Sequence, residues 1–224
     1  MTFAANVDRW LWWDWISRNT DLIWSSLREH VILTALALLI GLAVSVPLGV
    51  LASRKRWLYP PSLAITGALY TIPSLAAFSL LFPYTGLSRT TALIPLASYT
   101  LLILLRNVVE GLDAVPAEVK DAADGMGYSS MRRLVRIELP LALPTIMAGI
   151  RIATVTVIGL AAVAGLLAIP SLGNLIAIGQ NRPIRTAVTV GIALSVALAV
   201  TSDLLLALLQ RALSPWARSR AGGG

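Results

Sequence analysis

Cysteine is absent from this chain of 224 residues, and its single histidine is His30. These absences exclude disulfides, thiolate metal sites and cysteine nucleophiles, and with one histidine we expect no metal site. A phosphate-binding Walker loop needs Gly-Lys followed by Ser or Thr. The two lysines, Lys55 and Lys120, follow Arg and Val instead. We therefore expect a non-catalytic chain that does not hydrolyse ATP itself.

Charged residues are also scarce, at 13% of the chain, where a soluble domain has about 25%. The mean hydropathy is +0.77, and the runs 31–53 and 57–88 contain no charged residue. A helix crosses the hydrocarbon of a bilayer with about 20 apolar residues. The composition therefore predicts an all-α integral membrane protein. Its net charge of +7 then bears on orientation in the lipid bilayer and not on binding to nucleic acid.

Apolar runs separated by polar segments predict about five transmembrane helices. Their approximate limits are 31–53, 60–83, 91–109, 142–167 and 186–210. The second helix is expected to be broken, because proline removes a helical hydrogen bond and this span contains Pro60, Pro61, Pro73 and Pro83. Between the last two spans, the segment 169–183 has the composition of a loop with a short re-entrant or interfacial helix.

The basic residues predict which side of the membrane each loop faces. Five spans place the termini on opposite sides, and cytoplasmic loops carry the excess of Lys and Arg. The larger basic set comprises Arg54, Lys55, Arg56, Lys120, Arg132, Arg133, Arg136, Arg211, Arg218 and Arg220. We therefore expect a multi-pass protein of the cell (inner) membrane with its N-terminus outside. Its parts are an amphipathic outer segment (1–30), a membrane domain (31–210) and a cytoplasmic tail (211–224).

A polar insert at about 111–140 interrupts the apolar sequence, and its second part reads DAADGMGYSSMRRLVRIELP (121–140). Its glycines, serines and mixed charges predict two short helices around a turn. Pro116 suits the first position of the first helix, and Gly125 and Gly127 supply the positive φ that a sharp stop needs. By the distribution of basic residues, this insert faces the cytoplasm.

The second helix of the insert is expected to start at a cap, Ser129 or Ser130, and to end before Pro140. Three arginines on one face of it suit lipid phosphates: Arg132, Arg133 and Arg136. The first helix carries a small apolar patch made of Ala122, Ala123 and Met126. Two interpretations remain open from the residues alone. The insert is either a docking element for a cytoplasmic partner or an ordinary loop on the lipid headgroups.

The spacing of the insert resembles the EAA loop of permease subunits in binding-protein-dependent ABC importers. Asp121-Ala-Ala, Gly127 and Ile137-x-Leu-Pro140 match that motif, with Asp in place of the usual Glu. The resemblance implies a type I ABC importer permease whose insert forms the coupling helix, seated in a groove of the ATPase. The residues it assigns to ATPase coupling are Glu118, Asp121, Ala122, Ala123, Gly127, Ile137, Leu139 and Pro140.

Three further segments, 71–87, 104–119 and 139–159, look like the osmoprotectant branch of these importers, which carries glycine betaine, carnitine, choline or proline. The resemblance implies a dimer of partner ATPases that binds ATP and Mg²⁺, with no cofactor in this chain. It also implies a second permease subunit, identical or a sister chain, and a separate extracytoplasmic solute-binding protein. Two alternatives remain. The solute is another small molecule such as an amino acid or a thiol-betaine, or the chain is a secondary transporter.

Two charges interrupt the last two predicted spans at similar depth, Arg151 and Asp203. A charge inside the membrane is costly unless it is paired or wetted. The residues at four-residue spacing around the acid are small: Gly191, Ser195, Ala199 and Ala207. Since such a face packs closely against another helix, we predict an Arg151–Asp203 ion pair. The alternative is that Arg151 contacts the cytoplasmic loop or extends to the headgroups.

The remaining patterns are weaker. A row of small residues in the first span, Gly41, Ser45 and Gly49, indicates helix packing. Polar and kink-forming residues suggest a translocation path at Tyr70, Thr71, Pro73, Ser74 and Tyr99, with Thr100 facing them, although helical packing explains them equally well. The run WLWWDW (10–15) with Trp24 suits an aromatic belt at the membrane interface better than a cage for quaternary ammonium ions.

Overall fold

The computed structural model describes residues 10–182 and 184–216, and every regular element within those ranges is a helix. Four helices there are long and apolar enough to span a membrane, and a bent pair forms a fifth candidate span. The four are α3 (Thr20–Arg54), α6 (Arg89–Asp113), α9 (Leu139–Ala164) and α11 (Arg185–Leu213). The bent pair is α4 (Tyr59–Thr71) and α5 (Ser74–Thr85). The predicted all-α membrane architecture is confirmed.

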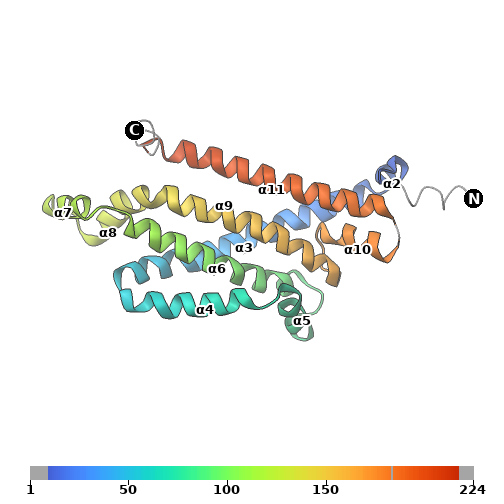
Figure 1. The fold of residues 1–224 in the computed structure, drawn as a ribbon, viewed down its shortest axis with the longest axis horizontal. Helices are drawn as coiled ribbons and strands as arrows, with labels where there is room; N and C mark the ends of the chain where they lie inside the picture. The colour runs from blue at the N-terminus through green and yellow to red at the C-terminus, as the bar shows by residue number, and fades with distance from the viewer. Residues whose placement is uncertain (1–9, 183, 217–224) are drawn as a thin grey trace, which may run out of the picture.

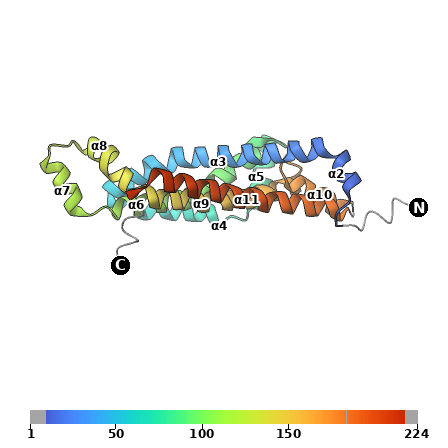
Figure 2. The ribbon, with the colours of Figure 1, turned by 90° about the horizontal axis from the view of Figure 1, so that it is seen from above.

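The long helices lie lengthwise beside one another and make the molecule elongated (Figure 1). Short helices occupy its two ends. The insert helices α7 (Ala117–Gly125) and α8 (Ser130–Arg133) project beyond the bundle at one end, where α3 and α11 finish (Figures 1 and 2). Helices α2 (Trp13–Arg18) and α10 (Gly173–Asn181) lie at the other end. The polar insert is thus the full length of the bundle away from α10.

Helix α6 packs against α3, α4, α5 and α9. The predicted small-residue row Gly41, Ser45 and Gly49 of α3 is buried against it. A Cβ added at Gly41 would overlap Thr100, and one added at Gly49 would overlap Val108. The two helix backbones therefore approach each other where side chains are missing. Helix packing is confirmed for this row, but Thr100 faces α3 and does not face the break in the second span.

Helix α3 starts well before the predicted first span, so the predicted limit of the membrane domain at residue 30 falls inside a helix. The prediction gave this part of the chain as an amphipathic outer segment, and the fold supplies its polar residues with partners. Glu29 accepts two hydrogen bonds from Arg89, at 2.6 and 2.7 Å. His30 is fully buried, and its Nδ1 accepts from the Leu172 N–H at 3.2 Å. Its Nε2 therefore carries the proton and donates to the Ile158 carbonyl at 3.1 Å.

The second span is broken, as predicted, and its two parts are bent by 87°. Ile72 and Pro73 have extended backbone, with ψ of 124° and 132°, and separate α4 from α5. The other prolines are accommodated within the helices. Pro60 and Pro61 lie at the start of α4, where a missing N–H costs nothing, and Pro83 lies inside α5.

At the end opposite the insert, α10 packs back onto the end of α9, which confirms the short helix predicted between the last two spans. The contact is between backbones. A Cβ added at Gly165 would overlap the backbone of Gly173 and Asn174, and one added at Gly173 would overlap the carbonyl of Ala162. Glycine is therefore required at both positions by close approach.

Candidate functional site

The polar insert folds as two short helices joined by a turn at Gly127, whose φ is +78°. Ser129 caps α8, since its Oγ accepts a hydrogen bond from the Arg132 N–H. Two details of the prediction are wrong. Pro116 is the N-cap residue before α7 and not its first helical residue, and Gly125 stays in the helix because a single left-handed residue suffices for the turn.

Pro140 does not end the second helix of the insert, contrary to the prediction. The chain continues from α8 through a π-helix (Leu134–Glu138) into α9, where Pro140 lies in the first turn. In a π-helix the N–H bonds five residues back, and the Leu139 N–H reaches the Leu134 carbonyl in this way. The wider turn leaves room for a proline ring that would clash inside an α-helix.

The motif residues differ in exposure. Glu118, Asp121, Ala122 and Gly127 are exposed on the insert, whereas Ile137, Leu139 and Pro140 are half-buried where the insert joins α9. Ala123 is fully buried, and Met126 is 67% exposed. The prediction of an exposed apolar patch is therefore wrong for one of its three residues. Its exposed part consists of Ala122 and Met126, while Ala123 faces inward.

Arg133 lies among acidic partners. The prediction that it belongs to a face for lipid phosphates is therefore wrong. Its Nε donates to Oε1 of Glu138 at 2.8 Å, and its Nη1 pairs with Asp124. Glu138 also accepts a hydrogen bond from Arg54 Nη2 at 2.8 Å and is only 3% exposed. Glu138 is not among the residues predicted from the sequence. Its one signal is an acid between apolar residues at the base of a span.

The structure brings Arg151 and Asp203 together within the apolar lengths of α9 and α11. Arg151 Nε donates to Oδ1 at 2.8 Å and Nη2 donates to Oδ2 at 2.9 Å, a two-pronged geometry that suits guanidinium and carboxylate. In the small row of α11, Gly191 is buried against Leu175 and Ile176 of α10, and the other members are half-buried. The ion pair thus ties the last two spans at one point along their length.

The residues suggested for a translocation path share one cavity of about 250 Å³ at the bend between α4 and α5. Those lining it are Tyr70, Thr71, Pro73, Ser74 and Tyr99. The two tyrosine rings meet edge to face with centroids 6.0 Å apart. Tyr99 Oη donates to the Ile72 carbonyl at 2.8 Å, so the break in the helix has a hydrogen-bond partner. Thr156 of α9, which the sequence analysis did not single out, completes the polar lining.

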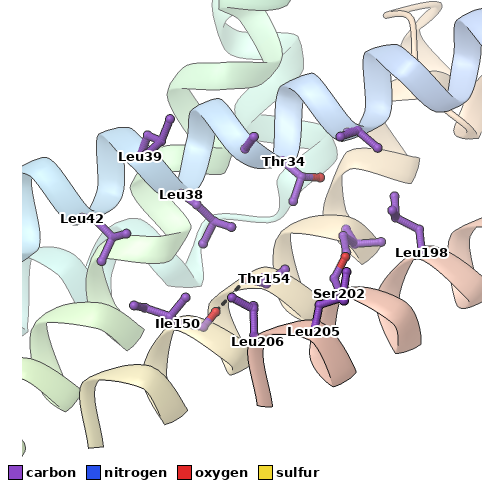
Figure 3. A pocket seen from close by; sticks show the side chains of 13 residues that line it. Thr34, Leu38, Leu39, Leu42, Ile150, Thr154, Leu198, Ser202, Leu205 and Leu206 are labelled. Carbon is purple, nitrogen blue, oxygen red and sulfur yellow. Dashed lines mark hydrogen bonds between the residues drawn. The ribbon is translucent and has the colours of Figure 1, made fainter. Parts of the chain in front are cut away.

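A second cavity, of about 450 Å³, lies between α3, α9 and α11, and its wall is almost entirely aliphatic (Figure 3). Two of its hydroxyl groups are engaged within their own helices. Thr34 donates to the His30 carbonyl and Thr154 to the Ile150 carbonyl. This wall offers little to a charged or zwitterionic solute, which loses hydration on entering it. The cavity at the α4–α5 bend is the better candidate for a polar path.

The tryptophans near the N-terminus differ in their surroundings. Trp13 and Trp24 are 71% and 68% exposed, whereas Trp15 is buried against Leu172 and Leu175. A cage for a quaternary ammonium ion needs several ring faces around one position. The arrangement fits the belt at the membrane interface and not the cage.

Comparison with known proteins agrees with the resemblance of the insert. The family model for the binding-protein-dependent transport system inner membrane component matches residues 45–218. The choline transport system permease protein OpuBD of Bacillus subtilis (strain 168) is 34% identical, over 92% of this chain and 92% of that protein. The osmoprotectant import permease protein OsmW of Salmonella typhimurium (strain LT2) is 35% identical, over 88% of this chain and 94% of that protein.

The fold is also similar to solved structures. A chain from inward-facing conformations of the MetNI methionine ABC transporter superposes with a TM-score of 0.78 at 22% identity, covering 91% of this chain and 99% of that one. At this identity the likeness shows the fold alone, which is that of a type I ABC importer permease. With the family model and the relatives, it leads to one conclusion. The chain belongs to the binding-protein-dependent transport system inner membrane components.

Proposed function

We propose that this chain forms the membrane pathway of an ATP-driven importer for compatible solutes of the quaternary ammonium type, such as choline, glycine betaine and carnitine. The observation that carries the proposal is the similarity, over about nine-tenths of the chain, to permeases named for choline and for osmoprotectants. The alternative solute is another small molecule such as an amino acid. A second reading, a secondary transporter, would leave the exposed coupling insert without a role.

The proposed partners are a cytoplasmic ATPase dimer, a second permease subunit and an extracytoplasmic solute-binding protein. ATP and Mg²⁺ bind to the ATPases, and this chain supplies no catalytic group or cofactor. The excess of basic residues near α7 supports a position on the cytoplasmic side. When ATP closes the ATPases, α7 moves with them and the spans open outward to receive the solute. Hydrolysis resets the spans. This cycle is alternating access, driven by movement of the insert.

Reconstitution tests this function. The complex with its ATPase and binding protein, in lipid vesicles, is expected to take up radiolabelled choline or glycine betaine when ATP is present. Labelled histidine serves as the amino-acid control. Uptake of histidine in place of both betaine-type solutes would favour the alternative solute. ATP-independent uptake by this chain without an ATPase would favour a secondary transporter and contradict the proposal.

The exposure of the insert makes a cross-linking prediction, for which the absence of native cysteine provides a clean background. Met126→Cys and Ala122→Cys are expected to cross-link to cysteines placed in the ATPase surface and to block uptake, because both side chains are exposed on α7 and its turn. Ala123→Cys is the matched control, since this position is buried and should not react. Intact uptake with no cross-link from either exposed position would contradict docking through α7.

We further propose that the cavity at the α4–α5 bend is part of the solute path, because its tyrosine faces suit a quaternary ammonium group. Tyr70→Ala is expected to lower the rate of choline uptake by about 2- to 30-fold, from a cation–π contribution of about 0.5–2 kcal/mol. Tyr70→Phe keeps the ring and should retain most uptake. Tyr84→Ala is the control, because Tyr84 is 83% exposed and outside this cavity. Equal rates of choline uptake for Tyr70→Ala and Tyr84→Ala would contradict a role of this cavity in the solute path.

A further inference from the structure

We infer that a chain of four charged side chains carries the movement of α7 to the first membrane helix. This ion-pair relay consists of Asp124, Arg133, Glu138 and Arg54, in that spatial order. The inference rests on the proposed function, since it assumes that α7 is moved by an ATPase. None of the four belongs to the motif residues assigned to coupling.

The centre of the relay is the carboxylate of Glu138. A single oxygen, Oε1, accepts from Arg133 Nε and from Arg54 Nη2, both at 2.8 Å. The side chain of Glu138 is 3% exposed and that of Arg133 is 13% exposed. Separating this buried carboxylate from both guanidinium groups would leave an unpaired charge in a poorly solvated place. These contacts are therefore stiff compared with ion pairs on the surface.

The ends of the relay lie on the two elements that must move together. Asp124 is in the last turn of α7, and Arg54 is the last residue of α3. Between them, Arg133 ends α8 and Glu138 ends the π-helix that leads into α9. A π turn holds one more residue than an α turn, so it shifts the direction of the side chain that follows. The relay thus joins α7, the base of α9 and the base of α3.

The relay makes a mechanical connection that helix packing does not supply. α7 projects beyond the bundle, away from the apolar contacts between α3, α6 and α9 (Figure 2). A second tie, from Lys120 Nζ to the Leu112 carbonyl at 3.2 Å, holds α7 to the end of α6. Displacement of α7 thus pulls on α6 through a flexible lysine and on α3 through charged contacts that resist separation.

The test compares transport with ATP hydrolysis in the reconstituted complex, using radiolabelled choline as the probe. Glu138→Gln, Arg54→Gln and Asp124→Asn are expected to raise the ATP hydrolysed per choline imported by about fivefold or more, the usual lower range of coupling between sites. Asp124→Asn guards against misfolding, because this side chain is 50% exposed. The amount of assembled complex should stay unchanged in that variant.

The matched controls are Arg56→Gln and Asp113→Asn. These residues form another arginine–carboxylate pair at the same end of α3, but neither residue belongs to the contacts that lead to α7. Both controls should keep the wild-type ratio, because this pair is not part of the chain of contacts between α7 and α3. A control that changes the ratio as much as Asp124→Asn would overturn the relay, since charge loss anywhere at this end would then suffice.

A double variant separates a relay from independent contacts. Arg54 and Asp124 are connected only through Arg133 and Glu138 in the chain of contacts described above, so breaking either end should already disconnect α7 from α3. Arg54→Gln with Asp124→Asn is expected to have no larger effect than the stronger single variant. Effects that multiply, or an unchanged ratio in assembled Asp124→Asn, would overturn the relay alone. Absence of ATP-dependent uptake by the unmodified complex would instead contradict the proposed function, and the relay with it.

Discussion

Gly173→Ala is expected to destabilise the chain by about 3 kcal/mol, the upper part of the usual range for overpacking. The added Cβ would overlap the carbonyl of Ala162, which is backbone and cannot rotate away as a side chain can. The first turn of α10 would have to lift from the end of α9. That shift would also disturb Trp15, which is buried against Leu172 and Leu175. Tryptophan fluorescence of the detergent-purified protein on heating should therefore show a lower midpoint of unfolding.

The control for this prediction is Gly159→Ala in α9. A Cβ at Gly159 meets no atom within 4 Å, and alanine is favoured over glycine in a helix by up to about 1 kcal/mol. The two substitutions are chemically identical, so the expected effects differ only because of their surroundings. An unfolding midpoint for Gly173→Ala equal to that of Gly159→Ala would show that α10 does not rest on the α9 backbone.

Breaking the Arg151–Asp203 pair is expected to reduce assembled, transporting complex to below about a tenth of the wild-type amount. Arg151→Leu leaves the Asp203 carboxylate without its two hydrogen bonds between apolar helices. Asp203→Leu leaves the guanidinium in the same position. Both should be visible as loss of monodisperse complex and of ATP-driven uptake. Arg106→Gln is the control, because the Arg106–Glu110 pair is local to α6 and exposed.

Two double variants show what the pair is for. The charge exchange Arg151→Asp with Asp203→Arg should restore part of the assembly, since the opposite charges face each other again. The apolar pair Arg151→Met with Asp203→Leu should restore assembly as well, because no charge then remains unpaired. Uptake that returns with assembly would mean a purely structural tie between α9 and α11. If neither double variant gave more assembled complex than the single variants, the result would contradict the pairing.

The coupling insert illustrates how far sequence patterns reach. The turn at Gly127, the cap at Ser129 and the two short helices follow from local residue preferences, and the structure has them. Such preferences do not determine which side of α7 is buried and which is exposed. Ala122 and Ala123 are adjacent and chemically identical, yet one is exposed and the other is fully buried. Only the packing of α7 against its neighbours in the folded insert, such as α8, distinguishes them.

The sequence by itself determined that this is a membrane protein, that its second span breaks and that its insert resembles a coupling loop. These three properties depend on residues that are near one another in the sequence: apolar runs, prolines and motif spacing. They can therefore be recognised without the structure. Tertiary structure decided the rest because its contacts join distant positions. Arg54 meets Glu138 across 84 residues, and His30 accepts a hydrogen bond from the Leu172 N–H across 142. A buried charge shows its partner only when the helices have packed around it.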